Sequence, residues 1–382
     1  MTRPTTPSRD QAPNGKTGRI AVWDPFVRIF HWSLVTAVGT AALTGLFASA
    51  TWINVHVWAG AVITGLVAMR IVWGFLGGRN ARFSGFVTSP AKVLAHLAAL
   101  RGGGGERHLG HNPAGAVMIV ALMTILLALA MTGLAVFGGV LKRGPLASVL
   151  PFGTAWSLRE LHEVLAYGLL MLVGLHLAGL LYESLRTREN LARAMVSGSK
   201  EARPGDHVAP PARARPVIAG VIAIGMIGAA AAGMSALSRQ PAFNIPTGGL
   251  DPVYADECGA CHMAYHPSLL PRRSWQSLVT GLADHFGEDA SLPETTLEGI
   301  RTYVMANAAE AFDTKPAHML ARVNPDMPFT LTETPFWKRV HGDLPAAVFE
   351  RATIGAKGNC QACHRDADSG LFYPGNINIP KE

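Results

Sequence analysis

Charged residues are scarce in this chain of 382 residues. Asp, Glu, Lys and Arg make up only 15% of it, while 49% is hydrophobic and the mean hydropathy is +0.23. This composition is too apolar for an ordinary soluble protein. A phosphate-binding loop, a dinucleotide fingerprint, a catalytic triad and a paired-carboxylate site are all missing from the sequence. No residue is therefore assigned a catalytic role.

Cysteine is also scarce, and all four cysteines lie in two Cys-x-x-Cys-His motifs. This spacing is typical of covalent c-type haem attachment, in which both thiols bond to the haem and the histidine binds its iron. A zinc site or a redox disulfide would also use such thiols. Neither explains why a histidine follows the second cysteine twice, and no cysteine remains for a disulfide framework. The two motifs are Cys258, Cys261 and His262, and Cys360, Cys363 and His364.

Long apolar runs dominate the first two thirds of the chain. A transmembrane helix needs about 20 apolar residues, and five runs meet this length, near residues 26–48, 52–76, 114–138, 158–182 and 216–237. The fifth contains no histidine and no charge, which predicts a simple tether. Residues 1–22 are polar and predict a disordered tail without a cleavable signal peptide. Residues 191–215 predict a linker between the bundle and the tether.

Basic residues are distributed unevenly around these spans. With the N-terminus inside, the inner segments carry 18 basic residues and the outer segments before residue 240 carry 4. This bias predicts a cytoplasmic N-terminus and places residues 240–382 outside, in the periplasm of a bacterium. Residues 1–239 have a net charge of +13 and residues 240–382 a net charge of −6. The overall charge of +7 thus reflects membrane topology and indicates no nucleic-acid partner.

Four histidines lie within the predicted spans, where ionisable residues are rare and functional by default. His162 and His176 are separated by about four turns, so they share one helix face about 21 Å apart in depth. The topology puts His31 at the depth of His176, and His56 at the depth of His162. A haem in a helical bundle is held by such facing side chains. We therefore predict an inner haem b bound by His31 and His176, and an outer one bound by His56 and His162.

Several segments resemble the bacterial cytochrome b561 and Ni,Fe-hydrogenase b-type cytochrome family. They are VWDPFVRIFHWSLV, HVWAGAVITGLVAMRIVWGFLG, GHNPAGA, ELHEVLAYG and GLHLAGLLYES. The resemblance implies a four-helix bundle over residues 23–190 with two b haems on the four histidines. Glycines 39, 45, 60, 168 and 174 would allow close approach of helices and macrocycles. His111, in GHNPAG, is a candidate for a role near a quinone or the inner haem, or simply the residue at the start of a helix.

The C-terminal region, residues 240–382, resembles the soluble dihaem cytochrome c family in DECGACHMAYHPSLLPRRSW, ADHFGEDASL and NCQACHRDADSG. That family carries electrons with two bis-histidine haems. The resemblance implies His285 and His341 as the second ligands, and sequence proximity assigns His285 to the haem of His262 and His341 to the haem of His364. The swapped pairing is equally easy to build. From the residues alone, the other candidates are His266, His318, Met263, Met305, Met319 and Met327.

The predicted fold class is an all-α membrane protein with a di-haem b bundle, a fifth tether helix and a small dihaem c domain. The predicted function is electron transfer between the quinone pool, with quinol as donor, and a periplasmic partner such as a soluble cytochrome c, across the bacterial inner membrane. It would be a carrier or a quinol:cytochrome oxidoreductase. Two alternatives are the anchor subunit of a hydrogenase- or dehydrogenase-like enzyme and a haem-based gas sensor. Co-purified catalytic subunits would favour the first alternative, and carbon monoxide binding the second.

Overall fold

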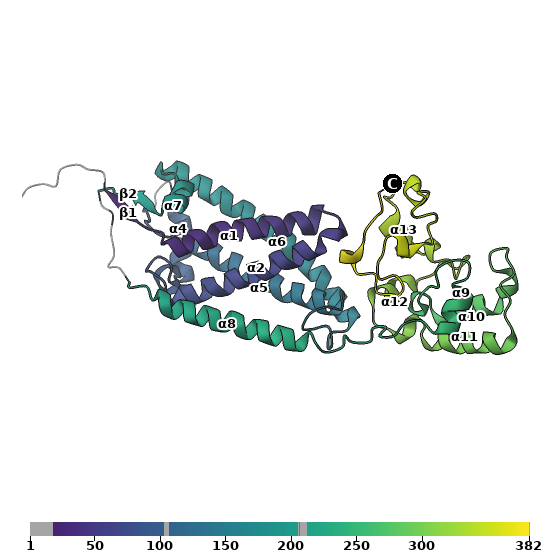
Figure 1. Ribbon diagram of the computed structural model, residues 1–382. Coiled ribbons are helices and arrows are strands. Elements are labelled where there is room, and N and C mark those ends of the chain that lie inside the picture. The colour runs from purple at the N-terminus through teal and green to yellow at the C-terminus, as the bar shows by residue number, and fades with distance from the viewer. Residues whose placement is uncertain (1–17, 103–106, 205, 207–211, 382) are drawn as a thin grey trace, which may run out of the picture. The chain divides into compact units, whose positions relative to one another are not determined.

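A computed structural model describes residues 18–102, 107–204, 206 and 212–381. It is predominantly helical (Figure 1). The five predicted spans are confirmed as helices long and apolar enough to cross a membrane, at Pro25–Phe47, Ala50–Leu76, Pro113–Gly139, Phe152–Thr187 and Pro216–Leu237. The fourth extends past the predicted residues 158–182 at both ends, and its last turns contain the charged residues Glu183 and Arg186. These residues lower the hydropathy of the ends without breaking the helix.

The regular α-helical parts of these spans are α1 (Pro25–Ala42), α2 (Ile53–Leu76), α5 (Pro113–Gly139), α6 (Phe152–Thr187) and α8 (Pro216–Leu237). Two of them begin at an Asx-Pro pair. Asp24 accepts a hydrogen bond from the Val27 N–H at 2.8 Å, and Asn112 accepts one from the Gly115 N–H at 2.7 Å. The side chain satisfies an N–H group that has no partner at a helix start, and proline fits the first helical position.

The chain divides into two compact units, each containing one part of the helical bundle. The first unit holds residues 1–33, 68–123 and 170–223. Its short elements are α3 (Phe83–Phe86), α4 (Pro90–Arg101) and α7 (Leu191–Ser197), with strands β1 (Arg19–Ala21) and β2 (Ser199–Glu201). The strands pair antiparallel, with Arg19 opposite Glu201. Residues 19–21 of the predicted disordered tail therefore form a strand paired with β2, and the predicted linker contains α7 and β2; residues 1–17 lie outside the described residues.

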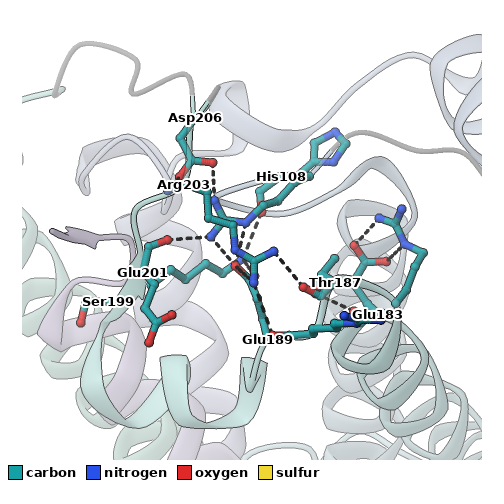
Figure 2. Close-up of polar contacts among 12 residues, drawn as sticks. His108, Glu183, Thr187, Glu189, Ser199, Glu201, Arg203 and Asp206 are labelled. Atoms are coloured by element: carbon teal, nitrogen blue, oxygen red, sulfur yellow. Dashed lines mark hydrogen bonds and ion pairs between the residues drawn. The ribbon is translucent and has the colours of Figure 1, made fainter. Parts of the chain in front are cut away.

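An ion-pair network joins the end of α6 to the segments before α5 and after α7 (Figure 2). The Arg107 guanidinium pairs with the carboxylates of Glu189 and Asp206. Arg203 donates hydrogen bonds to the carbonyls of Thr187 and Arg188, at 2.9 and 3.3 Å. The last carbonyls of a helix lack partners within it. The network thus ends α6 and anchors the segment that follows it.

The second unit holds residues 34–67, 124–169 and 224–382. Its membrane part includes a π-helical turn at Leu43–Phe47 and a 3₁₀ turn at Ala50–Trp52. Its C-terminal part folds around buried Tyr254, Trp275 and Val304. The helices of that part are α9 (Pro252–Cys258), α10 (Arg272–Thr280), α11 (Glu294–Ala306), α12 (Lys315–Leu320), α13 (Pro335–His341) and α14 (Ala346–Phe349).

Within the second unit, Asp313 contacts the segment between α5 and α6. Its carboxylate accepts hydrogen bonds from the Lys142 ammonium at 2.7 Å and from the Phe152 N–H at 2.8 Å. The Tyr373 hydroxyl donates to the Asn54 side chain at 2.6 Å. The described C-terminal part is therefore connected to the ends of the membrane helices by polar contacts as well as by the chain.

Candidate functional site

The first Cys-x-x-Cys-His motif lies at the end of α9. Cys258 is the last residue of that helix, and Cys261 and His262 follow in the next turn. The His262 ring lies opposite the His285 ring, with 6.2 Å between the ring centroids and 31° between their planes. His285 comes directly after a short 3₁₀ turn, Leu282–Asp284. The structure thus brings a second imidazole to the first motif from a segment some 20 residues away.

The second motif has the same arrangement. His341 is the last residue of α13, and its ring centroid lies 6.0 Å from that of His364. A cavity of about 220 Å³ is lined by His341 together with Trp337, Leu344 and Phe349. Burial lowers the pKa of both His341 and His364. This favours the neutral imidazole, which is the form that binds a metal ion.

The structure places these histidine pairs as sequence proximity predicts and not in the swapped arrangement. The other candidate histidines have different partners. His266 is buried, with its Nδ1 2.8 Å from the Ser268 hydroxyl. His318 is half exposed, with its Nε2 2.9 Å from Asp313 and its ring stacked on Phe152. Which imidazoles bind iron stays a prediction.

In the membrane bundle, the His56 and His162 rings lie 6.2 Å apart between centroids, with their planes at 77°. His56 belongs to the first turn of α2, and His162 to the third turn of α6. His31 and His176 both lie in the first unit and interact electrostatically. The structure therefore brings His56 and His162 together as helix depth predicts, and it puts His31 and His176 in the same unit.

The ring separations match the space that an iron ion needs between two imidazoles. A metal–nitrogen bond of about 2.0 Å on each side, with the size of the rings, puts two trans ring centroids roughly 6 Å apart. Three of the four pairs have this separation. All four cysteines are free thiols, and in the described part of the chain no three potential metal ligands form a cluster. The residues present therefore fit haem, with thiols available for covalent attachment at two of the sites.

Three of these histidines hold their Nδ1 in a hydrogen bond to a backbone carbonyl, which leaves the opposite nitrogen, Nε2, free for a metal. His56 Nδ1 bonds to the Ala41 carbonyl at 2.9 Å, His262 Nδ1 to the Met263 carbonyl at 2.8 Å, and His341 Nδ1 to the Trp337 carbonyl at 3.1 Å. A carbonyl accepts only, so each Nδ1 carries the hydrogen. Metal-bound histidines commonly hold their second nitrogen in this way, which sets the tautomer and the ring orientation.

Thr132 holds the Nδ1 of His162 and is a residue that sequence reasoning missed. Its hydroxyl donates to the Ala128 carbonyl at 2.8 Å, so its oxygen accepts from His162 Nδ1 at 2.9 Å. The side chain is buried in α5. A threonine that bonds to the carbonyl four residues earlier is common in helices. The sequence therefore contained no signal that distinguished Thr132 from other threonines.

Two of the glycines lie against the histidines. A Cβ at Gly45 would lie 2.7 Å from His56 Cε1, and one at Gly133 would lie 3.2 Å from His162 Cε1. The first distance is too short for any side chain without movement of the imidazole. Beside Gly39, Gly60 and Gly174 nothing lies within 4 Å of such a Cβ. These helix surfaces are open enough for a flat macrocycle to approach.

A helical membrane bundle with facing histidines, joined to a region with two Cys-x-x-Cys-His motifs, defines a membrane-bound haem electron-transfer protein. Residues 22–198 match the prokaryotic cytochrome b561 family, and residues 254–372 match the dihaem cytochrome c family. Each region of the chain thus matches one of these two families of haem proteins.

Individual relatives correspond to one region each. A probable Ni/Fe-hydrogenase B-type cytochrome subunit from Rhizobium leguminosarum bv. viciae is 24% identical over 214 residues, which are 47% of this chain and 88% of that protein. A solved dihaem cytochrome c from Rhodobacter sphaeroides is 43% identical and covers 32% of this chain and 96% of its own, with a TM-score of 0.28. A solved dihaem cytochrome c from Shewanella baltica is 32% identical. The match covers 34% of this chain and 92% of that one, with a TM-score of 0.28.

Proposed function

We propose that this protein carries electrons from quinol in the membrane to a soluble acceptor in the periplasm. The observation that carries the proposal is the recurrence of facing imidazoles, about 6 Å apart, in both the bundle and the C-terminal region. Haem iron at such positions takes up and releases one electron at a time. The chain orients the ligands for two b-type and two c-type haems.

Each ligand has a definite role in this proposal. His31 and His176 hold one b haem, and His56 and His162 hold the other. Cys258 and Cys261 would attach the first c haem covalently, and His262 and His285 would bind its iron. Cys360 and Cys363 would attach the second, and His364 and His341 would bind its iron. With two imidazoles for each iron, the chain would leave no position open for a gas ligand.

The direction of transfer follows from the chain's contents and charge. The sequence has no nicotinamide or nucleotide fingerprint that would supply electrons from the cytoplasm, so a lipid-soluble donor suits a bundle of this kind. The basic inner segments support a cytoplasmic N-terminus and a periplasmic position for the acidic C-terminal region. An acidic region suits a basic soluble cytochrome c as acceptor. The Asp313 contacts to Lys142 and Phe152 support a short path from bundle to C-terminal region.

The test is stepwise reduction of the full-length protein in proteoliposomes. A reduced quinol analogue should reduce the b haems before the c haems, and a soluble cytochrome c outside should then be reduced. The double variant His162→Ala, His176→Ala loses one axial ligand of each b haem and should abolish c haem reduction by quinol. His96→Ala is the control, because that imidazole lies on α4, outside all four sites and away from the Asp313 contacts. Unchanged c haem reduction in the double variant would disprove transfer through the bundle.

A second candidate function is the anchor subunit of a larger enzyme. The Rhizobium relative is described as a probable Ni/Fe-hydrogenase B-type cytochrome subunit. This description favours an anchor function for the part of the chain that matches the relative. Mild solubilisation and purification from native membranes distinguishes the two functions. Stoichiometric catalytic subunits bound to the chain would support the anchor, whereas quinol:cytochrome c activity of the isolated chain supports the carrier.

A further inference from the structure

Arg70 is a buried charge inside a membrane span. Its side chain is only 4% exposed, and it lies in α2. The guanidinium packs on two aromatic rings, 5.4 Å from the centroid of Phe83 and 6.0 Å from that of Phe86. Its Nη1 has no hydrogen-bond partner. A buried cation is costly unless an anion pairs with it, so this arginine requires an explanation.

The described residues supply no such anion within ion-pair distance of Arg70. Asp24 is the carboxylate that interacts with it electrostatically. The oxygens of Asp24 are already bonded, Oδ1 to the Val27 N–H at 2.8 Å and Oδ2 to the Trp73 indole N–H at 3.0 Å. Asp24 therefore accepts one hydrogen bond at the start of α1 and one from the Trp73 side chain of α2. The free Nη1 of Arg70 remains available for another acceptor.

Arg70 lies at the depth of the His31 side of the bundle. It is six residues before the end of α2 at Leu76, and His31 is six residues after the start of α1 at Pro25. Both are thus about 9 Å along the helix from that end. Both belong to the first unit, as does His176.

His111 lies beside the same aromatic group. Its ring centroid is 4.8 Å from that of Phe86 and 4.6 Å from that of Trp23, and its Nδ1 also has no hydrogen-bond partner. Burial, and then the charges of Arg70 and Lys200, lower the pKa of His111 to about 3. His111 is therefore neutral at physiological pH, and Arg70 is the cation of this group.

We propose that the Arg70 guanidinium binds a propionate carboxylate of the haem held by His31 and His176. The inference rests on the proposed function, because it assumes a haem at that pair. A haem carries two carboxylates, and the planar fork of arginine matches a carboxylate through two parallel N–H groups. Phe83 and Phe86 shield the pair from lipid and orient the guanidinium. A neutral quinone would leave the buried cation uncompensated, so the propionate is the favoured ligand.

The first test compares Arg70→Met with Arg70→Lys in the full-length protein by redox titration. Without the cation, the bare propionate stabilises the ferric state, so the potential falls. At a fixed ambient potential we expect the oxidised-to-reduced ratio of the His31–His176 haem to rise at least tenfold in Arg70→Met, which is 59 mV for one electron. Arg70→Lys should keep most of the wild-type value. The haem is identified as the one lost in His176→Ala.

The matched control is Arg159→Met. Arg159 is also an arginine on an aromatic ring in a span, 5.0 Å above Trp156, but it already pairs with Glu163 at 3.3 Å and is half exposed. We expect no change at the His31–His176 haem in this variant. An Arg70→Met protein with unchanged potentials and an altered KM for quinol would overturn the proposal and indicate a quinone contact instead.

The second test remains informative where Arg70→Met binds haem weakly. Haem-depleted full-length protein is reconstituted with ordinary haem b or with haem b whose propionates are methyl esters. The wild type should bind ordinary haem at least tenfold more tightly at this site, and Arg70→Met should lose or reverse that preference. An equal preference in both proteins would overturn the proposal. Retention of all b haem in His176→Ala would instead disprove the proposed ligation itself, so the two failures are distinguishable.

Discussion

His162 and Thr132 form a hydrogen bond across two helices, with His162 Nδ1 2.9 Å from the Thr132 hydroxyl oxygen. The threonine hydrogen goes to the Ala128 carbonyl at 2.8 Å. The hydroxyl is therefore an acceptor for the imidazole, and the other ring nitrogen of His162, Nε2, is left without a hydrogen. One threonine on α5 thus sets the tautomer of a histidine on α6.

Replacement of Thr132 should affect one b haem only. In Thr132→Val the His162 N–H loses the threonine hydroxyl as an acceptor, so the imidazole becomes a weaker electron donor. The potential of the His56–His162 haem should then rise. Loss of such an indirect partner costs roughly 10–100-fold in metal affinity, so haem binding at this site should also weaken. Redox titration and haem content measure both effects. Thr64→Val is the control, because Thr64 bonds only to the Gly60 carbonyl of its own helix; an equal effect in both would contradict this role.

Substitution of either histidine of a membrane pair should remove the same b haem. His31→Ala and His176→Ala should each remove the same b haem, and His56→Ala and His162→Ala the other, because a bis-imidazole site needs both ligands. Pyridine haemochrome analysis of the wild type should give b and c haem in a one-to-one ratio. Spectra that show different haems lost in His31→Ala and His176→Ala would break the pairing.

The two c haems should open to carbon monoxide one at a time. His285→Ala removes the ring opposite His262, and His341→Ala removes the ring opposite His364, so each variant should bind one equivalent of carbon monoxide. The reduced wild type should bind almost none. His266→Ala is a suitable control, because His266 Nδ1 lies 2.8 Å from the Ser268 hydroxyl and the side chain is buried elsewhere. Carbon monoxide binding by the control at a c haem would instead favour His266 as a ligand.

Acid should loosen the network around Arg107. The hydrogen bond from Arg107 holds the pKa of Asp206 below its usual value. A carboxylate with a lowered pKa stabilises the folded state above its unfolded pKa of about 3.9. That stabilisation is lost as the pH falls through the lower folded value. Hydrogen exchange of residues 199–204 should thus accelerate several-fold below about pH 4.

The substitution Asp206→Asn separates this effect from general acid unfolding. It should give fast exchange in residues 199–204 already at neutral pH and remove most of the acid dependence there. Glu298→Gln is the control, because Glu298 forms an exposed pair with Arg301 on one helix. Such surface pairs contribute little. An Asp206→Asn protein with wild-type exchange at every pH would show that the network does not hold this segment.

The sequence determined the features that depend on neighbouring residues or on helical period. Cys-x-x-Cys-His is a local motif, and five apolar runs are sufficient for five spans because membrane insertion depends mainly on length and composition. The different membrane depths of His162 and His176 follow from the regular rise per residue of the helix that carries both. The Asx-Pro starts at Asp24 and Asn112 are equally local.

The tertiary structure decided what lies opposite each of these residues. Whether His285 or His341 faces His262 depends on how short helices pack around Tyr254 and Trp275, which chain distance does not specify. Thr132 and Arg70 belong to the same class, because each matters only through a group on another helix. Threonine is ordinary in a span, and in the sequence Arg70 is simply one of the basic residues of the inner segments. Burial beside a particular partner is a property of the packed chain. The strands at Arg19–Ala21 and Ser199–Glu201 formed for the same reason, since each alone has no partner for its backbone groups.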